Sequence, residues 1–307
     1  MGLLDEVRAG AATVAANAQL VRIRTDQVMQ YAASLPIEQA QSPELDPQTH
    51  YLGEPDATLA YVLTLDALNF GSGFFPHLKK RPGMSGYFTV ASSLKDLWLT
   101  QRPLTAEQMQ RITAADCVRI FGQDSENAVA GELMALFARA LNDLGVFLGE
   151  RYVGEPVKLV DAAEGSAERL VELLTAMPFY RDVGFYKRAQ LTAADLSTAG
   201  VAAFDDLDRL TIFADNLVPH VLRLDGLLEY DTDLLASIDR EELVAAGSRA
   251  ELEIRAGALH AVELIVDAAR RQGRPATAMQ LDYVLWNRGQ QPSYKAQPRH
   301  RTRTVFY

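Results

Sequence analysis

The sequence predicts a mainly α-helical fold with few short strands. Several segments repeat apolar residues every three to four positions, the spacing that gives a helix one apolar face. Strand-like runs are rare and do not alternate regularly with helices, so a doubly wound parallel sheet is not indicated. The 307 residues, 48% of them hydrophobic, can bury a core without disulfides or metals. We expect one compact domain over 1–307, with N-terminal helices and a connection in 1–57 and the core in 58–307; a small N-terminal helical subdomain is the alternative.

Four segments carry the helical pattern most clearly. Leu59–Phe70 follows Asp56, which can act as its N-cap. Glu132–Leu148 and Ala167–Met177 repeat apolar residues in the same way. The strongest pattern runs from residue 251 to Gly273, a residue suited to a helix C-terminus, and its apolar stripe consists of Ile254, Ala258, Ala261, Ile265 and Ala268.

Two strands and two irregular connections are also predicted. Tyr87–Val90 and the last seven residues, Arg301–Tyr307, have strand-like composition. Leu35–Gly53 is polar and contains three prolines, which indicates a surface connection. Phe70–Gly86 is rich in glycine and proline and must turn repeatedly, and such loops on a rigid scaffold often carry function.

Charge and composition exclude several classes of protein. Thirty Lys and Arg stand against forty Asp and Glu, and a net charge of −10 opposes binding to polymeric nucleic acid. A single cysteine, Cys117, provides neither a disulfide nor a thiolate cluster and indicates a reducing compartment. The charge-free stretches Ala9–Val21 and Pro82–Leu94 are shorter than the ~20 residues that span a bilayer. We therefore expect a cytoplasmic protein without a membrane anchor.

The common catalytic motifs are missing from the sequence. It contains no Walker loop, no GxGxxG after a strand, and no HExxH, GxSxG or paired-cysteine motif. The histidines show no metal-ligand spacing. We therefore assign no metal.

Asp66 and Asn69 form the first candidate site. Their three-residue offset predicts that both lie on one helical face. A carboxylate and an amide together suit the polar edge of a heterocycle. A helix-terminal cap or structural hydrogen bond explains them too, and the sequence favours this second interpretation because buried polar groups are normally satisfied.

Asp215 is the second candidate. It ends an apolar run four residues before Pro219, which lacks an N–H and disfavours helix at the preceding residue, so the backbone must break or restart here. A carboxylate in such a place can stabilise positive charge on a sugar during cleavage of a glycosidic bond. A cap on the next helix, made by Asp215 or Asn216, is an equal alternative.

Cations near the C-terminus form the third candidate. Residues 287–307 contain five Lys and Arg and no acid. A solvated basic tail is an equal alternative for such a composition, but the apolar end, Val305–Tyr307, indicates a docked terminus. A docked arginine can hold a phosphate through two hydrogen bonds. Lys187 lies between aromatic residues, and a surface lysine covering its neighbours is the more frequent explanation there.

Seven short motifs follow one another between residues 58 and 307: Leu65–Phe70, Gly86–Phe88, Phe185–Gln190, Phe213–Asp215 with Pro219, Glu253–Arg255, Asp282–Trp286 and His300–Thr304. In order and spacing they resemble the queuosine salvage proteins, which are queuosine 5′-phosphate N-glycosylases. The sequence departs from the family pattern at Asn216–Leu217 and at His220, where other members tend to carry Tyr-Arg and Gln.

The resemblance implies a helical fold similar to that of helical DNA glycosylases, in a monomeric cytosolic enzyme without metal or redox cofactor. It implies hydrolysis of queuosine 5′-monophosphate to queuine and ribose 5-phosphate, with Asp215 as the catalytic carboxylate. Because queuine is a deazapurine and lacks a basic N7, the protein must act mainly on the sugar, with Asp215 as nucleophile or as electrostatic stabiliser.

The same resemblance suggests how the substrate is bound. Asp66 and Asn69 can pair with the edge of queuine, while Phe70, Tyr283 or Trp286 packs on its face. We also expect Asp282 to contact the substrate, and Lys187, Arg301 or Arg303 to hold the phosphate. The alternatives are a non-catalytic carrier of queuine or a purine-like base, and a glycosylase acting on a base flipped from nucleic acid, which the net charge opposes.

Overall fold

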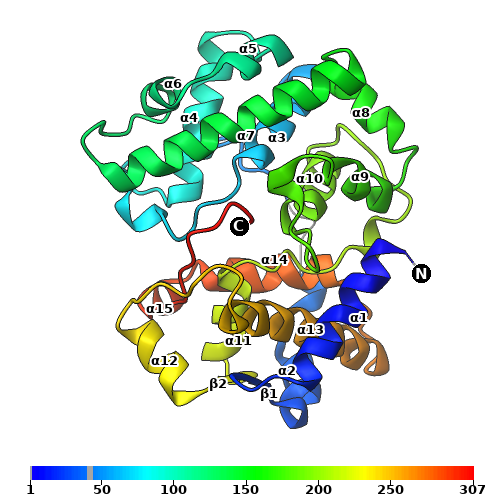
Figure 1. The fold of residues 1–307 in the computed structure, drawn as a ribbon. Helices are drawn as coiled ribbons and strands as arrows, with labels where there is room; N and C mark the ends of the chain where they lie inside the picture. The colour runs from blue at the N-terminus through cyan, green and yellow to red at the C-terminus, as the bar shows by residue number, and fades with distance from the viewer. Residues whose placement is uncertain (1, 40–43) are drawn as a thin grey trace. The chain divides into compact units, whose positions relative to one another are not determined.

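The computed structural model describes residues 2–39 and 44–307, so residues 40–43 of the predicted connection lie outside it. The chain divides into two compact units, each assembled from segments that are distant in sequence. Unit 1 comprises the described part of 1–43 with Val183–Lys187 and Asp208–Arg303, and unit 2 comprises Glu44–Asp182, Arg188–Leu207 and Thr304–Tyr307. Both units are mainly helical (Figure 1). The prediction of a single domain stays a prediction.

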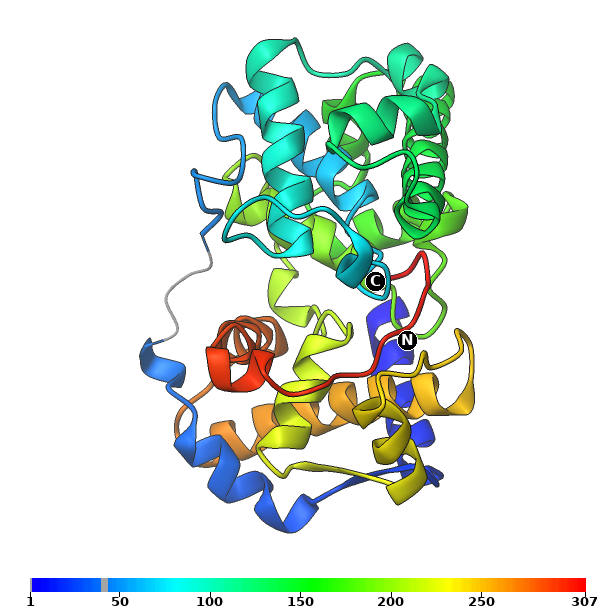
Figure 2. The same cartoon turned by 90° about the vertical axis from the view of Figure 1, so that its left-hand side faces the viewer.

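Unit 1 is built around one long helix. Its helices are α1 (Leu3–Ala16), α2 (Val28–Ser34), α11 (Leu217–Leu224), α12 (Thr232–Asp239), α13 (Arg249–Arg271), α14 (Ala278–Gly289) and α15 (Pro292–Lys295). Strands β1 (Val21–Ile23) and β2 (Leu228–Tyr230) pair antiparallel. Helix α13 packs against α1, α2, α11 and α14, and Figures 1 and 2 both show α1 and α2, in blue, beside the orange-brown α13.

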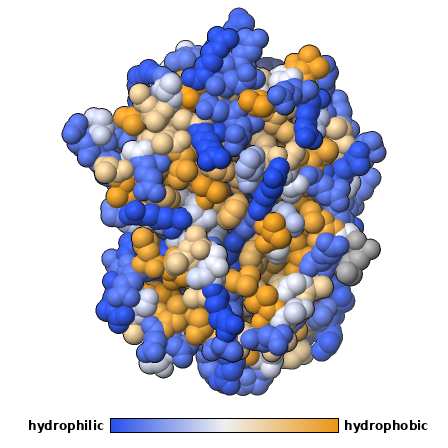
Figure 3. All heavy atoms as spheres, viewed as in Figure 1, coloured by the Kyte–Doolittle hydropathy of each residue, from blue (hydrophilic) through white to orange (hydrophobic). Residues whose placement is uncertain are grey.

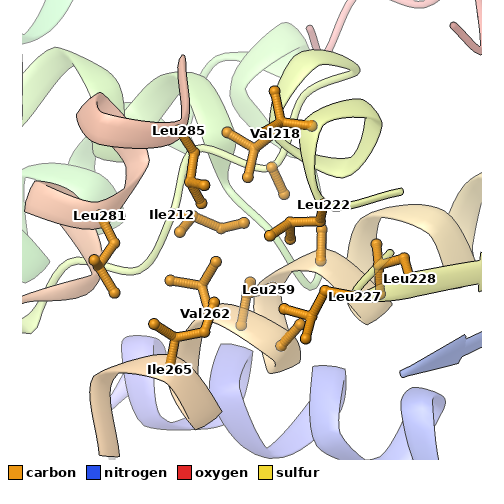
Figure 4. Packing of buried hydrophobic residues seen from close by; sticks show 14 of the residues in the cluster. Ile212, Val218, Leu222, Leu227, Leu228, Leu259, Val262, Ile265, Leu281 and Leu285 are labelled. Atoms are coloured by element: carbon orange, nitrogen blue, oxygen red, sulfur yellow. The ribbon is translucent and has the colours of Figure 1, made fainter. Parts of the chain in front are cut away.

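The core of unit 1 lies between α11, α13 and α14. Figure 4 shows Val218 and Leu222 of α11 facing Leu259 and Val262 of α13, with Leu285 of α14 beside them. All of these side chains are buried. At about 1.5–3 kcal/mol for each large aliphatic side chain removed from water, this cluster fixes the positions of the three helices.

Unit 2 is a second group of helices, centred on α7 (Ala128–Tyr152), which packs against α3 (Pro55–Ala67), α5 (Ala106–Arg111), α6 (Ala114–Ile120) and α8 (Pro156–Ala162). The other helices are α4 (Gly86–Thr100), α9 (Ala167–Leu174) and α10 (Lys187–Thr198), which enters unit 2 at Arg188. The chain terminus is docked in this unit, as predicted, since Tyr307 is buried and its carbonyl accepts the Gly71 N–H at 2.9 Å.

The mainly helical prediction with few short strands is confirmed, and the strongest predicted helix is α13. Ser248 caps its start by accepting the Glu251 N–H, and Gly273 follows its end with φ of +71°. The helix predicted over 132–148 lies within α7, whereas those over 167–177 and 59–70 end early, at Leu174 and Ala67.

Three local predictions are wrong. Tyr87–Val90 is helical, within α4, because Ser85 caps that helix by accepting the Phe88 N–H at 3.2 Å. Asp56 is not the N-cap of α3, which begins one residue earlier at Pro55. In Arg301–Tyr307 the only strand pairing among the described residues is an isolated bridge between Arg301 and Leu243.

On the face drawn in Figure 3, hydrophilic residues interrupt the apolar atoms and leave them in patches. Among the helices of residues 2–39 and 44–307, none is long and apolar enough to cross a membrane.

Candidate active site

Asp215 lies where an irregular segment, residues 210–216, meets helix α11. Its side chain is half-buried, and Oδ1 accepts the N–H groups of Leu217 at 2.7 Å and Val218 at 3.3 Å. Pro219 occupies the first turn of α11, where a missing N–H costs nothing. The predicted helix cap is therefore made by Asp215. Its other oxygen, Oδ2, accepts no hydrogen bond from the described residues.

Two buried charged side chains hold the segment that leads to Asp215. Asp282, on α14, accepts the Phe213 N–H with Oδ1 at 2.9 Å. Arg255, on α13, donates from Nε to the Ala214 carbonyl at 2.8 Å. Because both residues just before Asp215 are bonded to side chains of long helices, the position of the carboxylate is set by the core of unit 1.

Arg255 is itself held on two sides. Its guanidinium lies 4.0 Å from the centroid of the Phe185 ring, a cation–π contact, and Nη1 is 3.9 Å from Oε1 of Glu251. Glu251 also accepts the Gly247 N–H. Arg255 and Glu251 are both buried, and an ion pair in such surroundings is little screened by solvent.

One arginine and two histidines on or near the C-terminal segment of unit 1 have lowered pKa values. Arg299 is half-buried; burial lowers its pKa and the charge of Asp215 opposes that shift. Burial and the charges of Arg299 and Arg255 lower the pKa of His300 to about 3. Burial also lowers the pKa of His220 to about 4. Both histidines are therefore neutral near pH 7, and neither is tuned for proton transfer at that pH.

The two departures from the family pattern have structural consequences. Asn216 donates from Nδ2 to the His300 carbonyl at 3.4 Å. Nε2 of His220 lies 2.9 Å from the Tyr294 carbonyl. In this chain both residues therefore connect the start of α11 to the C-terminal segment of unit 1.

Two predicted substrate-binding residues lie close to the Asp215 segment. Asp282 is bonded to Phe213, and the ring of Tyr283 meets the Phe213 ring edge-on, with centroids 6.2 Å apart. Trp286 lies one turn further along α14 and is half-buried. Within unit 1 the structure thus brings Asp282 and Tyr283 onto the segment that leads to Asp215.

The cations predicted to hold a phosphate differ in their surroundings. Arg301 donates to the Glu241 carbonyl at 2.6 Å and pairs with the Glu241 carboxylate at 3.3 Å. Arg303 is half-buried. Lys187 is buried, so the interpretation of Lys187 as a surface lysine is wrong.

The residues predicted to bind the base from the first motif belong to unit 2. Asp66 is fully buried in the last turn of α3. Asn69 lies beyond the end of that helix, so the predicted shared helical face is wrong; its backbone N–H donates to the Asp66 carbonyl at 3.2 Å. Phe70 is a core residue, with its ring edge-on to Phe137 at 5.2 Å and to Phe179 at 5.9 Å.

A buried arginine that the sequence did not single out, Arg188, lies at the end of α3. Arg188 lies between the rings of Phe70 and Tyr180, at 4.8 and 4.7 Å, and donates to the carbonyls of Ala67 and Phe179. Burial lowers its pKa to about 10, so it stays charged at neutral pH. Arg188 fixes the C-terminal end of α3, where a cation also interacts favourably with the helix dipole.

Arg255, Glu251 and Arg299 were also absent from the predicted site. The sequence does contain a signal for Arg255, because it stands directly after Ile254 on the apolar side of a strongly patterned helix. Nothing in the sequence distinguishes Arg299 from the neighbouring arginines. Among the described residues, no cluster of His, Cys, Asp and Glu could hold a metal ion.

The fold and site together define a mainly helical protein with a half-buried carboxylate at a helix start, on a segment that two buried charged residues hold. Residues 49–307 match the family model for queuosine salvage protein, and the chain belongs to this family.

Relatives from bacteria and eukaryotes carry the name queuosine 5′-phosphate N-glycosylase/hydrolase, and three of them follow. The protein of Sphaerobacter thermophilus is 37% identical, over 100% of this chain and 98% of the relative. That of Dictyostelium discoideum is 32% identical over 82% and 79%. That of Mus musculus is 31% identical over 94% and 92%.

Proposed function

We propose that this protein hydrolyses the N-glycosidic bond of queuosine 5′-monophosphate and releases queuine and ribose 5-phosphate. The names of its full-length relatives supply the substrate. The observation that carries the chemistry is the placement of Asp215, whose Oδ1 is bound by two helix N–H groups while Oδ2 accepts no hydrogen bond from any described residue. A carboxylate held in this way is preorganised to act on a developing positive charge.

In the proposed reaction, the bond between the ribose C1′ and the base nitrogen breaks, and its electron pair goes to the base together with a proton. The hydroxyl of water ends on C1′. Asp215 stabilises the positive charge that develops on C1′ and the ring oxygen, or attacks C1′ before water does. The N–H groups of Leu217 and Val218 hold Oδ1 in place during this step.

Other residues keep the roles that the family resemblance suggested. We assign Tyr283 to packing on the base and Asp282 to both substrate contact and support of the Asp215 segment, because it already holds the Phe213 N–H. Trp286, Lys187 and Arg303 remain proposed substrate contacts, as do Asp66, Asn69 and Phe70 in unit 2. The pairing of Arg301 with Glu241 makes it the weakest of the phosphate candidates.

We also propose that the enzyme acts in the cytoplasm, as a monomer, on the free nucleotide rather than on polymeric nucleic acid. The acidic net charge of −10 supports the last point, because it repels a polyanion.

The test is release of queuine from queuosine 5′-monophosphate, followed by chromatography, with the purified full chain. Release that depends on Asp215 supports the proposal. Binding of queuine without any release would identify a carrier instead. Release only from tRNA or DNA, lost steeply with added salt, would identify a glycosylase of nucleic acid.

A further inference from the structure

Arg299 stands out among the cations near Asp215 because nothing in the described part of the chain pairs with it. It is half-buried, yet no hydrogen bond and no ion pair within 4.0 Å reaches its guanidinium from residues 2–39 or 44–307. The charge of Asp215 nevertheless acts on it. The residues that follow Asp215 and Arg299 are in contact, because Asn216 donates from Nδ2 to the His300 carbonyl at 3.4 Å. The two side chains therefore leave neighbouring stretches of backbone.

The neighbouring arginines already have partners. Arg255 bonds to the Ala214 carbonyl and pairs with Glu251. Arg223 donates to the Pro298 carbonyl at 2.8 Å. Arg288 pairs with Asp225 at 2.7 Å, and Arg301 pairs with Glu241.

The backbone on both sides of Arg299 is held in place. Before it, the Pro298 carbonyl accepts from Arg223; after it, the His300 carbonyl accepts from Asn216. The Arg301 carbonyl accepts the Val244 N–H at 2.9 Å. A side chain on such a segment loses less conformational entropy when it binds an anion than one on a free tail does.

We propose that Arg299 binds the 5′-phosphate of the substrate and determines the preference for the nucleotide over the nucleoside. This inference rests on the proposed function. A 5′-phosphate lies several bonds from C1′, so the cation that binds it must be near the carboxylate that acts on C1′ but separated from it. A guanidinium can form two parallel hydrogen bonds to a phosphate.

The experiment compares queuosine 5′-monophosphate with queuosine as substrates for the wild-type protein and for Arg299→Gln. We expect the preference, the ratio of the two kcat/KM values, to fall about ten- to hundredfold, mainly through KM for the nucleotide, as a lost charged hydrogen bond predicts. Arg299→Lys, which keeps the charge but not the two-pronged geometry, should restore part of the preference. Product inhibition by ribose 5-phosphate should weaken in parallel with the preference.

One variant serves as a matched control, and two test the rival arginines. Arg270→Gln removes an arginine paired with Asp267 on the exposed face of α13 and should change neither activity nor preference. Arg301→Gln and Arg303→Gln test the other C-terminal arginines. Thermal unfolding of each variant reports whether it is folded.

The results separate the two proposals. An unchanged ratio in folded Arg299→Gln, or a loss of preference in Arg303→Gln instead, would show that the phosphate is bound elsewhere. Equal losses on both substrates would show that Arg299 acts through Asp215 or the fold. If wild-type protein releases queuine from neither substrate, the proposed function fails; weakened ribose 5-phosphate binding by Arg299→Gln would still support the anion site.

Discussion

Replacing Asp215 with Asn tests the chemistry at the centre of the site. The amide keeps an oxygen that can accept the Leu217 and Val218 N–H groups, so the cap on α11 and the fold should survive. The substitution removes the negative charge. Asp215→Ala provides the comparison, because it removes the cap as well and should lower the free energy of unfolding by a further ~0.5–2 kcal/mol.

The expected loss of rate follows from the charge. A unit positive charge ~4 Å from the carboxylate is stabilised by about 4 kcal/mol at an effective dielectric constant of about 20. Removing one preorganised electrostatic contact of this kind costs ~3–4 kcal/mol in enzymes, which is ~10²–10³ in rate. A nucleophilic role would make the loss larger.

The assay is single-turnover release of queuine from queuosine 5′-monophosphate by Asp215→Asn, with binding of queuine and thermal unfolding measured on the same sample. We expect near-normal binding and unfolding with turnover reduced at least ~10²-fold. A well-folded variant that keeps more than about a tenth of the wild-type rate would refute the reasoning, and the catalytic acid would have to lie elsewhere.

Three further predictions concern base recognition, positioning and pH. Asp66→Ala should weaken queuine binding by about one to two decades if the carboxylate pairs with the base, at ~1–3 kcal/mol for an unsatisfied polar group; unchanged affinity in calorimetry would return Asp66 to a structural role. Arg255→Lys should lower kcat far more than it raises KM, because Lys keeps the charge near Glu251 but cannot reproduce the bond geometry to the Ala214 carbonyl; a change confined to KM would contradict a positioning role. His300 has a pKa of about 3 in the folded protein and an ordinary value of 6.5 when unfolded, so the unfolded chain binds the proton more readily. The free energy of unfolding should therefore fall as the pH drops from about 6.5 towards 3. Urea midpoints should fall less over this range for His300→Asn than for the wild type. An identical pH dependence of the two proteins would contradict a lowered pKa of His300 in the folded state.

Much of the helical fold was predictable because helix formation depends on residues close together in sequence. The stripe from Ile254 to Ala268 predicts α13, and Gly273 marks its end. Asp215 could be selected on local grounds as well, since its apolar flanks and Pro219 are read directly from the chain. Local signals failed where elements were short: β1 and β2 have three residues each, too few for a recognisable alternation.

The sequence by itself determined the helical class, the family motifs and the candidate carboxylate. Only the tertiary structure decided what surrounds that carboxylate. Asp282 reaches the Phe213 N–H across 69 positions of the chain, and Arg255 reaches the Ala214 carbonyl across 41. The partners of individual arginines also depend on the fold: Arg301 pairs with Glu241, whereas Arg299, two residues earlier, has no partner among the described residues. The physical reason is that helical periodicity arises from contacts between residues three to four positions apart, whereas burial and charge pairing depend on which distant segments the packed core brings together.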